Sequence, residues 1–387
     1  MRTLYLHIGT HRTATSSTQK FMHMNQKALL GRGYLYPFNT PRHLPQFNQL
    51  FGGKIEVGAF AEDLEARAAR RSGEMQAAGV AEGVHSVVLS DEDVCMRRDL
   101  SLLAGLRQHF DVKVVFALRR QDLWLESWYL QNIKWQWNRT LSHCTLDEFL
   151  ARRAEFFWAD YDRYVRHLEE VFGRENVLLY VFEKEQMPDG PVAAFCRMIG
   201  IEDISGLEPA PHSNPSYSTW VSEFMRLLPL DEAPAHYRSQ LERACGALEA
   251  TLTAGGRQKS ALLIDHARRE TILAEHAAGN AALARRYFDR DALFLAPVPG
   301  PEAPLARMEL PADSTVLMRD YVAPFVRGLI AQNRERPTPA AQAPAQGAAR
   351  EKPKGKGAAK DAAAEKGRRG GKGPGGRRRG ADGKVSA

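Results

Sequence analysis

Short runs of apolar and β-branched residues alternate with longer segments of helical periodicity over the first 200 positions. Residues 3–8, 34–37, 86–90, 112–118 and 177–182 are rich in Val, Leu, Ile and aromatic side chains. Runs of this length and composition are typical of buried strands. Because they are separated by helical segments, we expect parallel strands joined by crossover helices.

The segments between the strands predict the helices of this α/β fold. Apolar residues recur at helical spacing in residues 19–30, 59–81, 100–110, 122–137, 159–172 and 191–199. Residues 59–81 are rich in Ala, Glu and Arg and predict an exposed helix, whereas the prolines and glycines of residues 41–54 predict a loop. The expected architecture is a central parallel sheet flanked by helices in three layers.

The C-terminal part of the chain changes character twice. Residues 216–333 have helical patterns without a convincing strand, so we expect helices packed around the same sheet and one domain over residues 1–333. Residues 334–387 carry 15 Lys and Arg against 5 Asp and Glu, whereas the rest of the chain carries 38 against 41. Almost no large apolar residue occurs in this basic tail beyond residue 336. Such a composition predicts disorder.

The loop after the first strand has the composition of a phosphate cradle. Gly9 is followed by Arg12 and by the hydroxyl side chains of residues 13–17, directly before a predicted helix. Backbone N–H groups at a helix N-terminus, hydroxyl groups and an arginine together favour an anion. The ATP-binding P-loop needs a second glycine and a lysine, but Ala14 and Thr15 stand at those positions. An ordinary ATPase or kinase is therefore disfavoured.

The segment His7-Ile8-Gly9-Thr10-His11-Arg12-Thr13-Ala14-Thr15-Ser16-Ser17-Thr18-Gln19 resembles the 5′-phosphosulfate loop of bacterial sulfotransferases. These enzymes use 3′-phosphoadenosine 5′-phosphosulfate (PAPS). Arg12 replaces the family lysine, and Ala14 replaces a family glycine. A second resemblance lies at the end of the predicted strand of residues 112–118, where Arg119 is followed eight residues later by Ser127, as in the family's 3′-phosphate motif.

The resemblance implies a P-loop-like fold and transfer of a sulfuryl group from PAPS to a hydroxyl or amine, without a metal. The cofactor-binding residues that it implies are His11, Arg12, Thr13, Ala14, Thr15, Ser16, Ser17, Arg119 and Ser127. Arg12 would stabilise the leaving group. Glu92, after the strand of residues 86–90, is the expected base, and His43 is the second candidate.

Two other functions remain open on the sequence. A P-loop kinase-like enzyme would need the missing lysine. A non-catalytic nucleotide-binding module would explain the changes at Arg12 and Ala14, with the basic tail contacting a polyanion or a membrane surface. For a sulfotransferase, a glycan or glycolipid is the expected acceptor. The tryptophans of residues 122–137 predict core packing or an aromatic wall for a sugar ring.

Other features of the sequence point to a cytoplasmic protein. The four cysteines, Cys95, Cys144, Cys196 and Cys245, are widely spaced and form no CxxC pair, so reduced thiols are expected and a zinc site is not. No apolar run reaches about twenty residues, the length of a transmembrane helix. Residues 1–8 do not have the pattern of a signal peptide.

Overall fold

The computed structural model describes residues 1–210, 216–254 and 262–334. Contacts divide the chain into two units, of which Met1–Arg336 is the first. The second unit, Pro337–Ala387, lies outside the described residues, and with it the predicted disorder of the basic tail.

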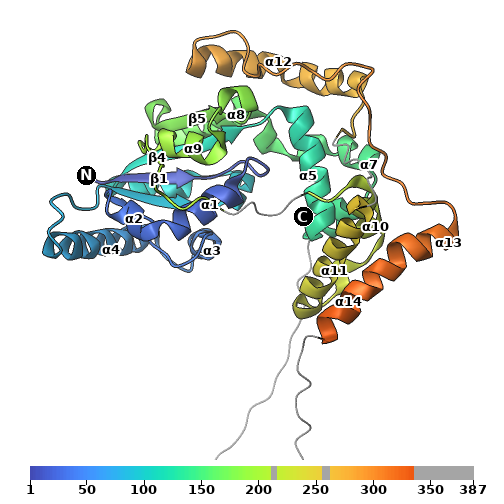
Figure 1. Cartoon of the computed structure of the whole chain (residues 1–387). Helices are drawn as coiled ribbons and strands as arrows, with labels where there is room; N and C mark the ends of the chain where they lie inside the picture. The colour runs from blue at the N-terminus through green and yellow to red at the C-terminus, as the bar shows by residue number, and fades with distance from the viewer. Residues whose placement is uncertain (211–215, 255–261, 335–387) are drawn as a thin grey trace, which may run out of the picture. The chain divides into compact units, whose positions relative to one another are not determined.

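Five parallel strands form one sheet in the order β2-β3-β1-β4-β5 (Figure 1). The strands are β1 (Thr3–His7), β2 (Tyr34–Leu35), β3 (Ser86–Ser90), β4 (Asp111–Leu118) and β5 (Val177–Val181). All five predicted strands are confirmed, with no end shifted by more than two residues. In the register, His7 of the central strand pairs with Ser90 on one side and Val115 on the other. The carboxyl ends of β1, β3 and β4 therefore open on the same edge of the sheet.

The two faces of the sheet belong to two hydrophobic clusters, which makes the predicted three layers. Val114 and Phe116 of β4 point into a large cluster with α4, α5 and α8, whereas Val115 and Ala117 point into a smaller one with α1, α2 and α9. Side chains of a strand alternate between faces, so a strand buried on both sides is apolar at nearly every position. This explains the continuous apolar run of β4.

The α-helices agree with most of the predicted segments. Their bounds are α1 (Thr15–Met24), α2 (Gln26–Leu30), α3 (Leu44–Phe51), α4 (Val57–Ala77), α5 (Gln121–Trp135), α6 (Arg139–Ser142), α7 (Leu146–Ala151), α8 (Tyr161–Phe172), α9 (Gly190–Met198), α10 (Thr219–Leu227), α11 (Ala235–Ala254), α12 (His266–Phe288), α13 (Ser314–Leu317) and α14 (Ala323–Arg334). Short 3₁₀ helices include η1 (Glu92–Met96) and η2 (Ser101–Gln108).

Four predictions about the helices were wrong in part. The predicted loop at residues 41–54 contains α3, which begins with Pro45 in its first turn, where proline is well tolerated. The first helix begins at Thr15, four residues earlier than predicted, and a break at Asn25 separates it from α2. Residues 101–108 form the 3₁₀ helix η2. Helix α4 is not exposed throughout, because Phe60 and Leu64 are buried.

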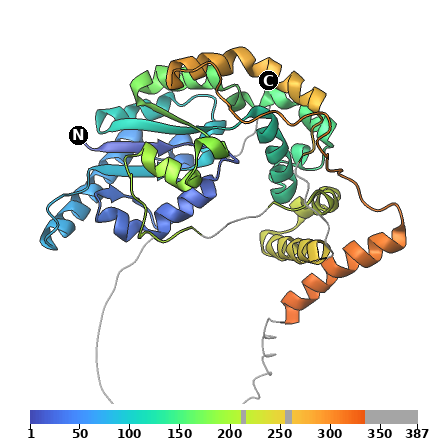
Figure 2. The same ribbon diagram turned by 45° about the horizontal axis from the view of Figure 1, so that its top comes forward.

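The helices that follow residue 216 pack in two groups. Helix α12 contacts α8 and α5, as Figure 2 shows, while α10 contacts α5 and α11, and α11 pairs with α14. Within the described ranges, no helix is long and apolar enough to cross a membrane. The four cysteines are free thiols, and all but Cys144 are buried.

Candidate functional site

A cavity of about 670 Å³ opens at the carboxyl edge of the sheet. Ligands in open parallel sheets bind outside this edge, where crossover connections leave the sheet in opposite directions. The cavity is lined by the loop after β1, the first turns of α1, the segments after β3, β4 and β5, and the last turns of α5. The lining residues are His11, Arg12, Ala14, Thr15, Ser16, Ser17, Gln19, Lys20, Thr40, Pro41, Arg42, Glu92, Arg119, Gln131, Lys134, Trp135, Trp137 and Phe182.

The loop after β1 has an unusual backbone conformation. Gly9 has a φ of 108°, and a Cβ there would lie 3.3 Å from the Cβ of Glu92, so the position needs glycine. Ala14, at the N-cap of α1, has a φ of 61°, in the left-handed region. Its methyl group cannot cap the helix, and the first N–H groups of α1 have no helical partner. Thr15 and Ser16, which carry these N–H groups, line the cavity.

Replacing Ala14 with glycine is expected to stabilise the protein by about 1 kcal/mol, because an L-residue is strained at this φ. Urea denaturation of the two proteins measures the difference. The matched control is Ala28→Gly, on the exposed face of α2, which should destabilise by about 1 kcal/mol because glycine is a poor helix former. Destabilisation by Ala14→Gly of the same size as in the control would contradict the strain at Ala14.

The structure brings the two predicted cofactor motifs together. The Nε of Arg12 donates to the Oγ of Ser127 at 2.5 Å, and its Nη1 donates to Gln131 at 3.0 Å. In turn, Nη1 of Arg119 donates to the backbone carbonyl of Arg12 at 2.6 Å. Arg12 thus meets residues from the end of β4 and from α5, all more than 100 positions away in the sequence, in one hydrogen-bonded group.

The hydroxyl side chains of the loop divide into two groups. Thr13 is buried and donates from Oγ1 to the carbonyl of Thr10 at 2.6 Å, so it stabilises the loop without lining the cavity. The second group, Thr15, Ser16 and Ser17, lines the cavity. Thr13, which the sequence predicts to bind the cofactor, therefore has its side-chain hydrogen bond within the loop itself.

His11 is a buried cation held by an aspartate. Burial lowers its pKa, but the hydrogen bond of its Nε2 to Asp93, at 2.9 Å, and the contact with Cys95 raise it to about 10. Its ring lies against Trp128, with centroids 4.7 Å apart, and its carbonyl accepts from the indole N–H of Trp124. The raised pKa favours the charged imidazolium, and the Asp93 carboxylate balances that charge.

Three consecutive acids, Asp91, Glu92 and Asp93, follow β3 and lie beside the loop that carries His11. Arg42 makes two hydrogen bonds to Asp91, at 2.9 and 3.0 Å, and lies 3.1 Å from Asp93. Glu92 accepts a hydrogen bond from Nε2 of Gln19 at 2.5 Å and lies 3.7 Å from Arg42. Because Asp91 and Asp93 neutralise Arg42 and His11, Glu92 is the carboxylate of this group that lines the cavity.

His43 lies behind the cavity wall. It is fully buried beside Tyr36 and Phe38, and its Nδ1 accepts from the backbone N–H of Ser90 at 3.2 Å. Burial, with a smaller contribution from His23, lowers its pKa to about 3, so the ring is neutral. Within the described chain, the cavity lining includes its neighbours Pro41 and Arg42 but not His43.

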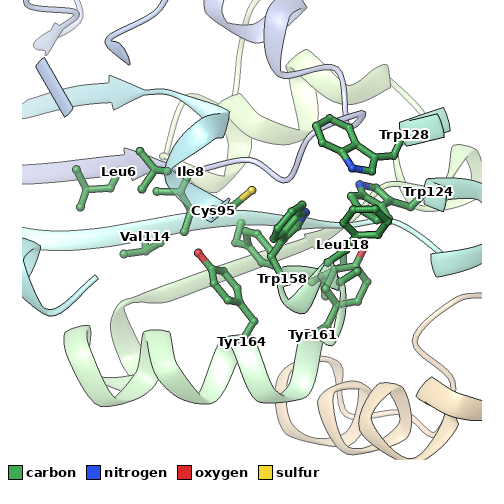
Figure 3. Packing of buried hydrophobic residues seen from close by; sticks show 14 of the residues in the cluster. Leu6, Ile8, Cys95, Val114, Leu118, Trp124, Trp128, Trp158, Tyr161 and Tyr164 are labelled. Carbon is green, nitrogen blue, oxygen red and sulfur yellow. The ribbon is translucent and has the colours of Figure 1, made fainter. Parts of the chain in front are cut away.

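The tryptophans of α5, together with Trp137 just after this helix, form two groups. Trp124 and Trp128 are buried and pack with Trp158 beside Leu118, at the end of β4 (Figure 3). The rings of Trp135 and Trp137 instead lie parallel, with centroids 5.8 Å apart, and line the cavity. Core packing therefore accounts for Trp124 and Trp128. Trp135 and Trp137 form an aromatic wall of the cavity.

Several cavity residues are not among those predicted from the sequence. Gln131 and Lys134 lie on the same face of α5 as Ser127 at helical spacing, a pattern that could have revealed them. Ser127 itself is buried and is not among the lining residues. Lys20 similarly lies one turn after Ser16. Burial, followed by the charge of Arg12, lowers the pKa of Lys134 to about 8. The sequence holds no such signal for Arg42, because the composition of its segment predicts a loop.

Comparisons with known proteins give limited information. No family model matches the chain. An uncharacterized protein of Archaeoglobus fulgidus is 28% identical over 145 residues, which is 35% of this chain and 38% of that protein, so the chain spans well under half of the relative it matches. The crystal structure of a sulfotransferase from Alicyclobacillus acidocaldarius aligns with 56% of this chain and 87% of that chain, at 17% identity and a TM-score of 0.33. A TM-score this low adds nothing to the α/β assignment, which rests on the chain's own sheet.

Proposed function

We propose that the protein is a sulfotransferase that moves a sulfuryl group from PAPS to a hydroxyl group of an acceptor. The observation that carries the proposal is the contact of Arg12 with Ser127 and of Arg119 with the carbonyl of Arg12. It joins the loop proposed for the 5′-phosphosulfate to the pair proposed for the 3′-phosphate. A nucleotide with anionic groups at both ends would match this arrangement.

The described residues fit such a donor in charge and in size. Arg12, Lys20, Arg119 and Lys134 line a cavity of about 670 Å³, and the uncapped start of α1 faces the same space. Helix N-termini and arginine forks are common phosphate ligands. Among the described residues, no group of three or more His, Cys, Asp and Glu side chains is placed to hold a metal ion.

When bound, PAPS supplies the sulfuryl group, whose bond to the phosphate oxygen breaks as a bond to the acceptor oxygen forms. The chain must position the two substrates, neutralise the leaving phosphate and accept the hydroxyl proton. Glu92 is our choice for the base, because it follows β3 at the cavity and its Oε2 is held by Gln19. The buried, neutral His43 supports the segment before α3 from behind, which favours Glu92 over the second candidate.

For the acceptor we propose a carbohydrate or a glycolipid headgroup. Trp137 is 55% exposed at the cavity, parallel to Trp135. Buried Gln136 fixes this turn, since its side chain donates to the carbonyls of Met225 and Leu228. An exposed indole suits the C–H face of a sugar ring, while Thr40 offers a hydrogen bond to its hydroxyl groups.

Replacing Trp137 with alanine is expected to raise the KM for a sugar acceptor by about tenfold, with little effect on 3′,5′-ADP binding. A panel of oligosaccharides with radiolabelled PAPS supplies the assay. Tyr237→Ala is the matched control, because Tyr237 is 53% exposed on α11 and is absent from the described cavity lining. Equal effects of the two substitutions would contradict an acceptor platform at Trp137.

Calorimetric titration of the purified chain with 3′,5′-ADP, 5′-AMP and ATP tests the proposed donor. We expect micromolar affinity for 3′,5′-ADP and binding at least about tenfold weaker for the other two nucleotides. A preference for ATP would contradict the proposal and favour a kinase-like enzyme. Binding of 3′,5′-ADP without sulfuryl transfer to any acceptor would favour a non-catalytic module. The contact of residues 337–387 with polyanions or membranes, and the cytoplasmic location, stay predictions.

A further inference from the structure

The side chain of Arg12 is surrounded by neutral oxygen atoms. Its three nitrogen donors contact Ser127 at 2.5 Å, Gln131 at 3.0 Å and Ser216 at 3.1 Å. Within the described parts of the chain, none of these partners is a carboxylate. Arg42, which also lines the cavity, is instead paired with three acids, Asp91, Glu92 and Asp93. The guanidinium of Arg12 therefore keeps its positive charge for a ligand.

The side chain of Arg12 is directed toward α5 and the segment before α10. Two of its partners, Ser127 and Gln131, lie one turn apart on α5, and the third lies just before α10. Arg119 holds the backbone carbonyl of the same residue. The only arginine of the loop thus extends toward the residues proposed for the 3′-phosphate.

Positive charges accumulate at this end of the cavity. Burial and then the charge of Arg12 lower the pKa of Arg119 to about 10 and that of Lys134 to about 8. Repulsion between these cations costs free energy that a doubly charged anion would recover. The Oγ of Ser127 accepts from Arg12, and a hydroxyl that accepts one hydrogen bond can still donate its own hydrogen to an anion.

We infer that Arg12 binds the 3′-phosphate of the donor nucleotide, together with Arg119 and Ser127, and so sets the preference for 3′-phosphorylated nucleotides. This inference rests on the proposed function. It differs from the leaving-group role expected at the position of the family lysine. The leaving phosphate is then held by the first N–H groups of α1, by Thr15, Ser16 and Ser17, and by Lys20.

Titrations of Arg12→Gln and Lys20→Gln with 3′,5′-ADP and 5′-AMP test the inference, because 5′-AMP lacks only the 3′-phosphate. For Arg12→Gln we expect a loss of about 10- to 100-fold for 3′,5′-ADP and less than about threefold for 5′-AMP. For Lys20→Gln, at the other end, both affinities should fall by a similar factor. Arg12→Lys keeps the charge without the fork, so an intermediate loss of preference is expected and can be measured if Arg12→Gln does not fold.

The outcomes separate the inference from the proposed function. Equal losses of both nucleotides in Arg12→Gln, the pattern expected for Lys20→Gln, would overturn the role in 3′-phosphate binding while the sulfotransferase proposal stands. A wild-type protein that binds 3′,5′-ADP no more tightly than 5′-AMP would overturn both. A loss confined to 3′,5′-ADP supports the inference.

Discussion

Replacing Arg119 with alanine is expected to lower the affinity for 3′,5′-ADP by about two orders of magnitude. Arg119 comes directly after β4, and although burial, followed by the charge of Arg12, lowers its pKa to about 10, it is charged at neutral pH. The substitution removes this charge and also the donor to the Arg12 carbonyl, which holds the loop. Both losses act at the same end of the nucleotide, so together they should produce this large decrease in the affinity for 3′,5′-ADP.

Calorimetry at a fixed salt concentration measures this effect, with Arg98→Ala as the matched control. Arg98 rests on the ring of Phe157 at 4.4 Å, as Arg119 rests on Phe182 at 5.5 Å, but it does not line the cavity within the described residues. The control should bind 3′,5′-ADP as the wild type does. A similar affinity in Arg119→Ala and Arg98→Ala would exclude Arg119 from the nucleotide site.

Local patterns explain why the strands and the cavity loop could be predicted. A strand buried on both faces must be apolar at nearly every position, so β3 and β4 are recognisable without any partner. The strand ends then identify Glu92 and Arg119, since the residues after the last position of each parallel strand lie at one edge of the sheet. The left-handed conformation of Ala14 agrees with the glycine that the resemblance places there.

Features that depend on distant residues could not be predicted in this way. The fork of Arg12 points to α5 because Ser127 and Gln131 accept there, and nothing within the loop specifies that direction. Arg269 likewise looks like one charge among many on α12, a helix with several other arginines. Its burial depends on partners more than 140 residues away.

Arg269 is fully buried and joins α12 to α5. Its Nη1 donates to Asp122 at 2.7 Å, its Nη2 donates to Glu126, and its Nε donates to the carbonyl of Ile264 at 2.9 Å. Arg120 donates to Asp122 as well, at 2.8 Å. Asp122 and Glu126 lie on the same helix as Ser127, Gln131 and Lys134, so this ion cluster stabilises an element of the candidate site.

Replacing Arg269 with methionine is expected to destabilise the protein by about 3–5 kcal/mol, because two buried carboxylates lose a shared partner while the volume stays similar. Urea denaturation measures the change. The matched control is the neighbouring Arg268→Met, which breaks only exposed ion pairs with Asp147 and Asp265 and should cost about 1 kcal/mol or less. Losses of equal size in the two variants would show that the buried cluster contributes no more than the exposed one.

The pH dependence of Arg269→Met gives a second, independent measure of the same cluster. In the wild type, burial raises the pKa of Glu126, whereas the pKa of Asp122 is lowered because its ion pairs with Arg120 and Arg269 outweigh its burial. Without Arg269, both folded-state values should rise above those of the unfolded chain. The folded variant then binds more protons than its unfolded state, so its stability deficit should shrink as the pH falls from about 7 to about 5. A deficit that stays constant or grows over this range would mean that lost packing, and not the unpaired carboxylates, is the cause of the destabilisation.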